Sequence, residues 1–478
     1  MKKQILIEQQ LLMTRIAVLQ EGEWTNFYVE SHLEEDMQNQ VVIGQIEQVV
    51  KNLKAVFVNY GSDKNGLLHI KQIPECYHTK LHPGSRLPVQ VVKQNVGKKG
   101  HKLTGKISLK GRFLVCLPFE TGINISKKIR DNAKRTQLKE VLGEVSKAQK
   151  SDYGFIVRTG AQEATKEQIE RDAKQLIEKA NQFMATKDFL SRGSVLYKEP
   201  PLYAQVINDE LNSEDEIEIV CNHQKLLTEI ESLLEEYGVT QQVKLILVDE
   251  KDEMFINYDI QKQLTHLTSR KIWLKNGGNL VVDYTEAMTI IDVNSAKAVL
   301  TKNPRKAVLD LNLLATKESV LQILRRNLAG IIIIDLVEMK EEEDKIAVYE
   351  MAKKLLKMYG DSRTKVYPLT ELGLLQFSRT GKYASLHHKL LAPCDVCGHP
   401  YSQNNMMYEL FLMEKQIKHV VTHTIQKQLV IQCTSQLLHE IGKYSLKNKL
   451  ESAYNIQLTF EKMEKISKDM FLCQFYSK

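Results

Sequence analysis

The segment Gly330–Asp335 most constrains the fold, because it reads as a glycine, four consecutive isoleucines and an aspartate. A run this apolar and β-branched is typical of a strand that is buried on both faces of a sheet. Helical patterns lie on both sides of it, at residues 307–328 and 347–358, and a second apolar run, at residues 288–292, also ends in an aspartate. We therefore predict an α/β layer in this part of the chain.

Two aspartates, Asp292 and Asp335, end these two runs. If the strands are neighbours, both carboxylates emerge at one edge of the sheet, where open α/β sheets place their sites. Such a pair can share Mg²⁺, which could activate water and neutralise a phosphodiester. Asn294 would lie on the same side as Asp292, within reach of a hydrogen bond to it. Strand-terminal aspartates also cap turns or helices, and Glu286 and Glu338 are alternative ligands, so the pattern alone leaves the metal site open.

The length of 478 residues exceeds what one core usually supports, and the hydrophobic content of 43% is enough for several cores. The first 30 residues contain three strand-like runs that predict an antiparallel meander. Short strands also dominate residues 37–117, where we predict a small barrel of the OB type. Its five predicted strands are Val41–Val50, Ala55–Tyr60, Gly66–Ile70, Leu87–Val92 and Leu114–Leu117.

Charge points to the same barrel. The net charge of +7 is small for the length, but the strip from Lys98 to Arg112 holds several basic residues and no acidic one. Basic and aromatic residues on an OB-type barrel form a surface for single-stranded nucleic acid. A solvated charged loop explains the strip equally well from charge alone.

A third candidate site is the sequence Arg158-Thr159-Gly160, which follows a predicted strand at residues 153–157. A helix is predicted to open at Thr165, with Gln168 completing a capping box. A guanidinium, a hydroxyl and free helix amides would suit a phosphate group. An ordinary loop is the more frequent meaning of such a pattern.

The seven cysteines do not indicate a disulfide framework, because their number is odd and no secretion signal accompanies them. Only Cys394 and Cys397 have the spacing of metal ligands, and a structural zinc site needs four. A redox dithiol and two unligated thiols are alternatives. The missing zinc ligands could come from His387, His388, His399, Cys433, Cys473 or the same cysteine pair of a second chain.

Two classes of protein are excluded. No apolar run approaches the ~18–20 residues of a membrane span, so we predict a soluble, cytoplasmic protein. Residues 100–107 nearly match a phosphate-binding loop, but Ile107 replaces the hydroxyl residue that holds Mg²⁺ in such loops.

Taken together, these motifs make the chain resemble the ribonuclease E/G family, and its length resembles that of the shorter members, which lack a C-terminal scaffold. The order and spacing of the matches agree over about residues 1–403. The matching segments are 55–61, 66–70, 102–109, 157–160, 273–296, 312–313, 330–339, 373–379 and the pair Cys394/Cys397. Among the departures, Leu67 stands where the family often has a second barrel aromatic, and Glu338 keeps the acidic character of its motif.

The resemblance implies an α+β multidomain protein. Its implied parts are an RNase H-like subdomain (1–36 and 198–268), an inserted OB-fold RNA-binding barrel (37–117), a 5′-monophosphate sensor (118–197), a DNase I-like α/β catalytic subdomain (269–390), a zinc link (391–403) and a small C-terminal dimerisation domain (404–478).

The resemblance also implies roles for individual residues. Asp292 and Asp335, with Asn294, would hold Mg²⁺, and Cys394 and Cys397 would share Zn²⁺ with a second protomer. The 5′-phosphate would be bound by Arg158, Thr159 and Arg363. On the barrel, we expect Phe57, Lys102, Lys106 and Arg112 to grip RNA.

We therefore expect a homodimer or higher homo-oligomer that acts as a Mg²⁺-dependent endoribonuclease. Its substrate would be single-stranded RNA, with a preference for 5′-monophosphorylated ends, in rRNA maturation, mRNA decay or both. A catalytically weak or inactive RNA-binding or ribosome-associated factor is the alternative.

Overall fold

The structure is a computed structural model. It describes residues 2–33, 37–93, 100–211, 216–239, 243–249, 253–258, 260–295, 303–393, 401, 403–425, 427–463 and 471–475. The chain divides into two compact units, which are described separately. The first unit holds residues 1–34, 214–228 and 242–478, and the second holds residues 35–213 and 229–241. Within the described ranges, none of the helices combines the length and the apolar character that crossing a membrane requires.

A closed five-stranded barrel lies in the second unit. Its strands pair in the order β4 (Val41–Val50), β5 (Ala55–Asn59), β6 (Gly66–His69), β8 (Lys102–Thr104) and β7 (Arg86–Lys93). Strand β7 pairs back with β4, which closes the ring, and β13 (Val195–Tyr197) adds to β4 from outside. Alternate residues such as Val56, Val58 and Val89 point inward and fill the barrel core.

The prediction that Leu114–Leu117 is a barrel strand is wrong. The segment does form a strand, β10, but β10 pairs with β9 (Leu109–Lys110) and β12 (Gly154–Val157) in a separate sheet. The barrel is closed instead by β8, which pairs parallel with β6 and antiparallel with β7. Since β8 has only three residues, Lys-Leu-Thr, it is too short to show an alternating pattern in the sequence.

The separate four-stranded sheet has the order β11 (Ile123–Ile125), β12, β10, β9. Helices α1 (Asn132–Ala148) and α2 (Lys166–Thr186) share a hydrophobic core with it. The predicted capping box is confirmed, because Thr165 accepts from the amide of Gln168 and the Gln168 side chain accepts from the amide of Thr165. Helix α3 (Leu202–Glu210) follows β13.

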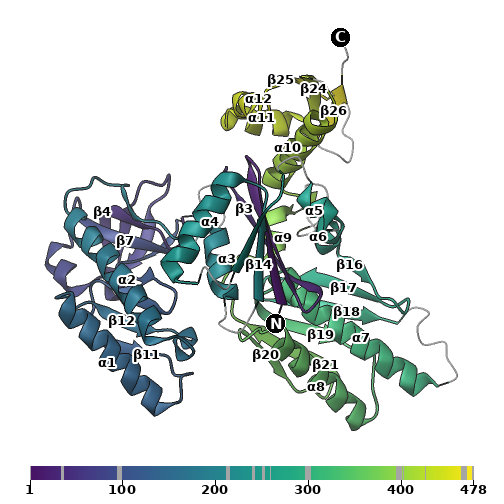
Figure 1. The fold of residues 1–478 in the computed structure, drawn as a ribbon, viewed down its shortest axis with the longest axis horizontal. Helices are drawn as coiled ribbons and strands as arrows, with labels where there is room; N and C mark the ends of the chain where they lie inside the picture. The colour runs from purple at the N-terminus through teal and green to yellow at the C-terminus, as the bar shows by residue number, and fades with distance from the viewer. Residues whose placement is uncertain are drawn as a thin grey trace. The chain divides into compact units, whose positions relative to one another are not determined.

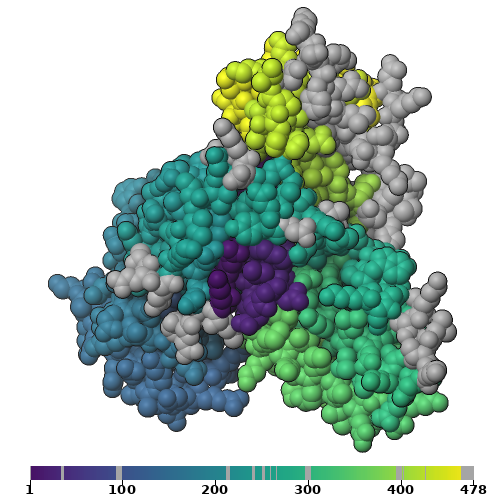
Figure 2. Space-filling model, turned by 45° about the vertical axis from the view of Figure 1, so that its right-hand side comes forward, coloured from purple at the N-terminus to yellow at the C-terminus, as the bar shows by residue number. Residues whose placement is uncertain are grey.

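A five-stranded sheet in the first unit joins segments that are far apart in the sequence. The predicted N-terminal meander is confirmed as β1 (Lys2–Gln9), β2 (Met13–Gln20) and β3 (Glu23–Ser31). Strands β14 (Glu216–Cys221) and β15 (Val243–Leu247) extend the sheet parallel to β1. Part of the N-terminal segment, in purple, reaches the molecular surface in Figure 2.

The other helices around this sheet are α4 (Gln224–Tyr237), whose second half belongs to the second unit, α5 (Met254–Asn257) and α6 (Ile260–Thr268).

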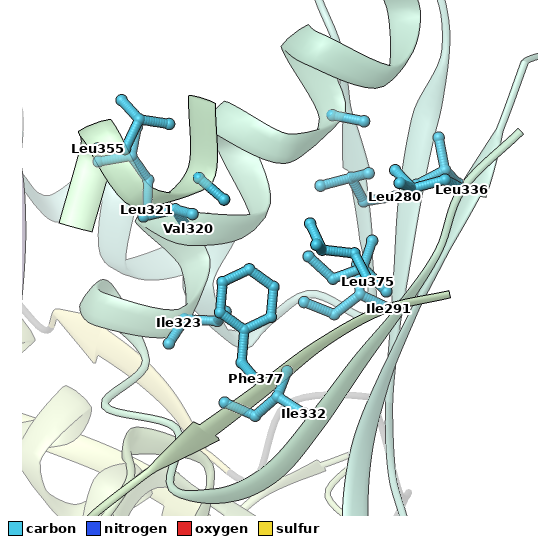
Figure 3. Packing of buried hydrophobic residues seen from close by; sticks show 14 of the residues in the cluster. Leu280, Ile291, Val320, Leu321, Ile323, Ile332, Leu336, Leu355, Leu375 and Phe377 are labelled. Atoms are coloured by element: carbon cyan, nitrogen blue, oxygen red, sulfur yellow. The ribbon is translucent and has the colours of Figure 1, made fainter. Parts of the chain in front are cut away.

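A six-stranded sheet forms the second layer of the first unit (Figure 1). Its order is β16 (Lys271–Trp273), β17 (Asn279–Tyr284), β18 (Met288–Asn294), β19 (Gly330–Asp335), β21 (Leu374–Arg379) and β20 (Thr364–Tyr367). Helices α7 (Pro304–Arg325) and α8 (Glu342–Met358) pack against each other and cover one face. Figure 3 shows this core, in which Phe377 and Ile332 of the sheet meet Ile323 of α7.

The prediction that Gly330–Asp335 is buried on both faces is wrong. Ile332 and Ile334 have no exposed surface. The side chain of Ile331, which alternates to the opposite face of the strand, is 50% exposed. The reason is that α7 and α8 both pack on the side to which Ile332 and Ile334 point. We call the opposite side of this six-stranded sheet its outer face.

The C-terminal part of the first unit contains a small three-stranded sheet with the order β25 (Gln457–Lys462), β24 (Gln428–Cys433), β26 (Phe471–Phe475). It shares a core with α10 (Met406–His423), α11 (Ser435–Lys443) and α12 (Leu446–Tyr454). Before α10 lie α9 (Leu386–Leu390) and the short strands β22 (Leu391–Ala392) and β23 (Gln403–Asn404). Cys394 and Cys397 fall outside the described residues, so the zinc link stays a prediction.

Candidate active site

The two aspartates at the ends of the apolar runs stand opposite each other. Strands β18 and β19 are parallel, and their register pairs Asp292 with Asp335. Neighbouring strands lie about 4.8 Å apart. The residues next to the aspartates, Ile291, Val293 and Ile334, point into the core, so both carboxylates point to the outer face. The predicted juxtaposition at one edge of the sheet is confirmed.

Asn294 supports the first of these carboxylates. Its Nδ2 donates a hydrogen bond of 2.6 Å to Oδ2 of Asp292, as the two-residue spacing predicts. The bond limits rotation of the Asp292 carboxylate and uses only one of its two oxygens. Two carboxylates with an amide beside them are hard oxygen donors, which is the donor chemistry that Mg²⁺ prefers. The residues present therefore fit Mg²⁺.

The alternative ligands differ in position. Glu286 lies in the turn between β17 and β18, at the opposite end of β18 from Asp292. Four residues of extended chain from Met288 to Asp292 span about 13 Å, so Glu286 does not belong to this site. Glu338 is exposed and lies three residues beyond Asp335, in the segment that follows β19.

A cationic and aromatic pair shares the outer face with the aspartates. The strand registers place Lys271, Val281, Asp292 and Asp335 in one row across the sheet. The next row contains Trp273, Asn279 and Asn294. The Trp273 side chain is 66% exposed, and Nζ of Lys271 lies 4.2 Å from its ring centroid.

Sequence reasoning missed Lys271 and Trp273. Trp273 is the first residue of the matched segment 273–296, and its two-residue spacing from Lys271 within a strand was the available signal.

A salt bridge lies on the same sheet, with Asp283 two residues along β17 from the row of the aspartates. Arg270 donates from Nε and Nη2 to the two carboxylate oxygens of Asp283, at 2.5 and 2.7 Å. This hydrogen bonding raises the pKa of Arg270, and the charges of Asp283 and Asp292 act in the same direction. Arg270 therefore adds positive potential near the aspartate pair without binding it directly.

Asn312, a residue of the matched text with no role assigned from the sequence, positions the end of β19. Its side chain has no exposed surface. Nδ2 donates to the carbonyl of Val337 at 2.7 Å, and Oδ1 accepts from the amide of Val337 at 3.1 Å. Val337 is two residues beyond Asp335, so helix α7 holds the backbone that carries this aspartate.

The barrel presents two of the predicted RNA-binding residues, Phe57 and Lys102, in one row. The registers of β5, β6 and β8 pair Phe57 with Leu67 and Leu67 with Lys102. Phe57 and Leu67 are partly exposed, and Lys102 is exposed. An aromatic ring, an apolar side chain and an ammonium thus lie side by side on the outside of the barrel.

The other two predicted barrel residues lie elsewhere. Lys106 follows β8, is half exposed and forms an ion pair of 3.8 Å with Glu120. Arg112 is in the turn between β9 and β10, and its guanidinium packs over Phe113 and Tyr237, at 4.7 and 5.6 Å from the ring centroids. Burial lowers the pKa of Arg112. Arg112 is therefore built into the packing of the second unit and lies outside the barrel row.

Arg158 and Thr159 lie at the end of β12. Nη1 of Arg158 donates to the carbonyls of Gly111 and Arg112, at 3.0 Å each, which fixes the plane of the guanidinium. The Thr159 hydroxyl is 3.0 Å from that of Ser126. A 3₁₀ turn at Thr159–Gln162 follows this pair, and α2 begins at Lys166, directly after the predicted cap Thr165. The phosphate pocket at this pair stays a prediction.

A buried carboxylate also binds the turn that contains Gly111 and Arg112. Asp172 of α2 is 7% exposed and accepts hydrogen bonds from the amides of Arg112, Phe113 and Leu114, at 3.0, 2.7 and 2.9 Å. Burial raises the pKa of Asp172 despite these bonds. The turn is thus fixed through its amides by Asp172 and through its carbonyls by Arg158.

Arg363, the third predicted phosphate ligand, belongs to the first unit and precedes β20. Its Nε lies 3.4 Å from Oδ1 of Asp361, which also pairs with the buried Arg379 at 3.0 Å. Its side chain is 26% exposed. Two of the alternative zinc ligands, His387 and His388, lie in an aromatic cluster with Tyr284 and Tyr401.

Comparison with known proteins identifies the family. The profile of the Ribonuclease E/G family matches residues 108–382, which is more than half of the chain. This chain belongs to the ribonuclease E/G family. The match contains Asp292 and Asp335 as well as Arg158, Thr159 and Arg363.

Individual relatives cover most of the chain. Ribonuclease G of Salmonella typhimurium is 29% identical over 417 residues, which are 83% of this chain and 83% of the relative. Ribonuclease G of Haemophilus influenzae is 26% identical, and the match covers 92% of this chain and 95% of the length of the relative. Ribonuclease E of a Nostoc species is 27% identical over 75% of this chain but only 53% of its own length. A solved Podospora anserina methyltransferase matches at 14% identity with a TM-score of 0.10, which is too low to indicate a common fold.

Proposed function

We propose that this chain, an endoribonuclease of the ribonuclease E/G family, hydrolyses single-stranded RNA with a Mg²⁺ ion held by Asp292 and Asp335. The observation that carries the proposal is the register of β18 and β19, which sets the two carboxylates opposite each other on the open face of a sheet. When bound, Mg²⁺ supplies water activation and neutralises charge on the phosphodiester. Asn294 orients Asp292, and Asn312 holds the backbone next to Asp335.

Each unit offers its own contacts for RNA. On the barrel, Phe57 and Leu67 form an apolar step on which a base can stack, and Lys102 beside them meets the phosphate backbone. On the outer face of the six-stranded sheet, Trp273 offers a second stacking surface with Lys271 over its ring. Stacking is tolerant of sequence, because every base has an aromatic face. We therefore expect a preference for single-stranded RNA of varied sequence.

We further propose that Arg158 and Thr159 bind a 5′-monophosphate, and that Arg363, in the first unit, is a separate phosphate-binding candidate. The guanidinium of Arg158 uses one nitrogen for the two carbonyls of the 111–112 turn, and a guanidinium has five N–H donors in all, so donors remain for a phosphate.

We also propose a homodimer or higher oligomer that shares Zn²⁺ through Cys394 and Cys397. Processing of rRNA precursors or decay of mRNA would be its pathway.

The test compares cleavage and binding in matched variants. Asp292→Asn and Asp335→Asn should abolish cleavage of a 5′-monophosphorylated oligonucleotide and leave its binding within a few fold, because they remove a metal ligand and little volume. The control is Asp310→Asn, since Asp310 is an exposed aspartate of helix α7. Cleavage should require Mg²⁺ and should be slower on a 5′-triphosphate substrate.

Cleavage at the wild-type rate by both variants would refute the assignment of Asp292 and Asp335 as metal ligands. Metal-independent RNA binding with no cleavage of any substrate by the unaltered chain would favour the alternative, a non-catalytic RNA-binding factor. The barrel row alone is compatible with that alternative, so the cleavage assay and not the binding assay decides between them.

A further inference from the structure

Two histidines of α10 form a pair on an exposed face of the helix. His419 and His423 are four residues apart, which places them one turn apart on the same side. Their ring centroids are 4.4 Å apart with an interplanar angle of 33°. Nδ1 of His423 contacts the carbonyl of His419 at 2.8 Å, which fixes the direction of this ring. A histidine pair at this spacing is a metal-binding arrangement in many helices.

A carboxylate from a distant part of the chain completes a set of three. Glu253 comes immediately before α5, and its Oε1 lies 2.6 Å from Nδ1 of His419. One donor atom of Glu253, one of His419 and one of His423 all lie within 4.8 Å of one another. The side chain of His419 is 57% exposed and that of Glu253 is 20% exposed, so an ion can enter from solvent.

Hydrophobic packing fixes the two elements that carry this cluster, the start of α5 and helix α10. Met254 and Phe255, the residues after Glu253, share a hydrophobic core with Tyr408 and Phe411 from the first half of α10. The second half of α10 packs into the core of the C-terminal domain. The three side chains are therefore presented from fixed backbones, which reduces the cost of ordering them around an ion.

We propose that Glu253, His419 and His423 form a zinc-binding site, which ties the start of α5 to the end of α10. Two imidazoles and one carboxylate are the donors that zinc takes when it keeps a fourth position for water or another ligand. Mg²⁺ is excluded by the same chemistry, since it prefers oxygen donors. The site uses none of the residues of the aspartate pair or of the cysteine pair at Cys394 and Cys397.

The surroundings limit the affinity. Lys415 and Lys418 line a small cavity together with Glu253. Burial lowers the pKa of Lys415 to about 8, and the charge of Glu253 opposes that shift. The positive charge of Lys415 near the Glu253 carboxylate weakens the binding of a cation there, so we expect a reversible site that fills and empties with the zinc supply.

The experiment measures zinc bound to the full-length chain after chelation and equilibrium dialysis. It uses a background in which Cys394 and Cys397 are both replaced by Ser, so that thiolate zinc does not contribute. The variants are His423→Ala and Glu253→Gln. The matched control is His439→Ala, because His439 is an exposed histidine of helix α11 in the same part of the chain.

We expect one zinc per chain in the background and in the control, a loss of that zinc in His423→Ala and at least tenfold weaker binding in Glu253→Gln. Cobalt in place of zinc should give visible d–d bands without the near-ultraviolet band of a cobalt–thiolate bond. Zinc should raise the unfolding temperature of the background but not of His423→Ala. Equal zinc content in the background and His423→Ala would overturn the proposal, and so would a background that binds none.

Discussion

Replacement of Asn312 by Ala should disturb the position of Asp335 and slow cleavage, although it changes no proposed metal ligand. The substitution removes the two hydrogen bonds that join the Asn312 side chain to the amide and carbonyl of Val337. A neutral hydrogen bond contributes roughly 1 kcal/mol net, and a peptide group left without a partner adds a further penalty of similar size. Because Val337 is partly exposed, water can replace part of the loss. We therefore expect a loss of about 2–3 kcal/mol.

The most direct assay of this loss is hydrogen exchange at the amide of Val337. Since about 1.4 kcal/mol corresponds to a factor of ten, its protection should fall by roughly 30- to 140-fold. Displacement of a catalytic group by about 1 Å can cost a hundredfold in rate. Single-turnover cleavage should therefore slow about 10- to 100-fold, and half-maximal activity should require more Mg²⁺, because Asp335 lies two residues from the released segment.

The control and the refuting result are both specific. Asp310→Ala changes an exposed residue on the same helix and should alter neither exchange at Val337 nor the Mg²⁺ requirement. The reasoning fails if Asn312→Ala loses protection at Val337 and still cleaves with the wild-type rate and Mg²⁺ dependence. In that case the segment after β19 does not position Asp335.

Three further predictions address other parts of the chain. Trp273→Ala should raise KM for RNA by about 5- to 140-fold, and Trp273→Phe should retain most of the affinity, because stacking of one base is worth ~1–3 kcal/mol. Asp172→Asn should lower the free energy of unfolding of the second unit by roughly 2–4 kcal/mol, because it disrupts bonds from three amides to one charged acceptor. Glu178→Gln, on the exposed side of the same helix, should change it little in the same denaturant titration. Burial lowers the pKa of His387 to about 3, so between about pH 6.5 and 3 only the unfolded chain binds a proton at this histidine. The free energy of unfolding should therefore fall as pH falls through that window. In His387→Phe the unfolding midpoint should depend less steeply on pH.

The sequence predicted strands and helices where their hydrophobic periodicity is local. The β4 segment was predicted to the residue, and the opposition of Asp292 and Asp335 followed from two apolar runs ending in the same way. Local pattern failed where a partner far along the chain decides the outcome. The three residues of β8 close the barrel only through their neighbours β6 and β7.

Individual side chains show the same limit. Arg112 belongs to a basic strip in the sequence, yet it packs against Tyr237 and lies outside the barrel row. Glu253 and His419 are 166 residues apart, so no spacing rule connects them. Asn312 was part of the matched text, but its bonds to Val337 could be assigned only once α7 was placed against β19.

The four isoleucines of β19 show why a catalytic strand can resemble a fully buried one. Ile332 and Ile334 anchor the sheet under α7 and α8, and that anchoring fixes where the strand ends. Alternation then sends Asp335 to the side away from the helices. A helix over that side would bury two carboxylates, whose ionised forms are costly to remove from water, and it would keep out both a cation and an RNA strand. The exposure of Ile331 therefore follows from the open outer face, and the partly exposed Ile333 lies between it and Asp335 on the same face.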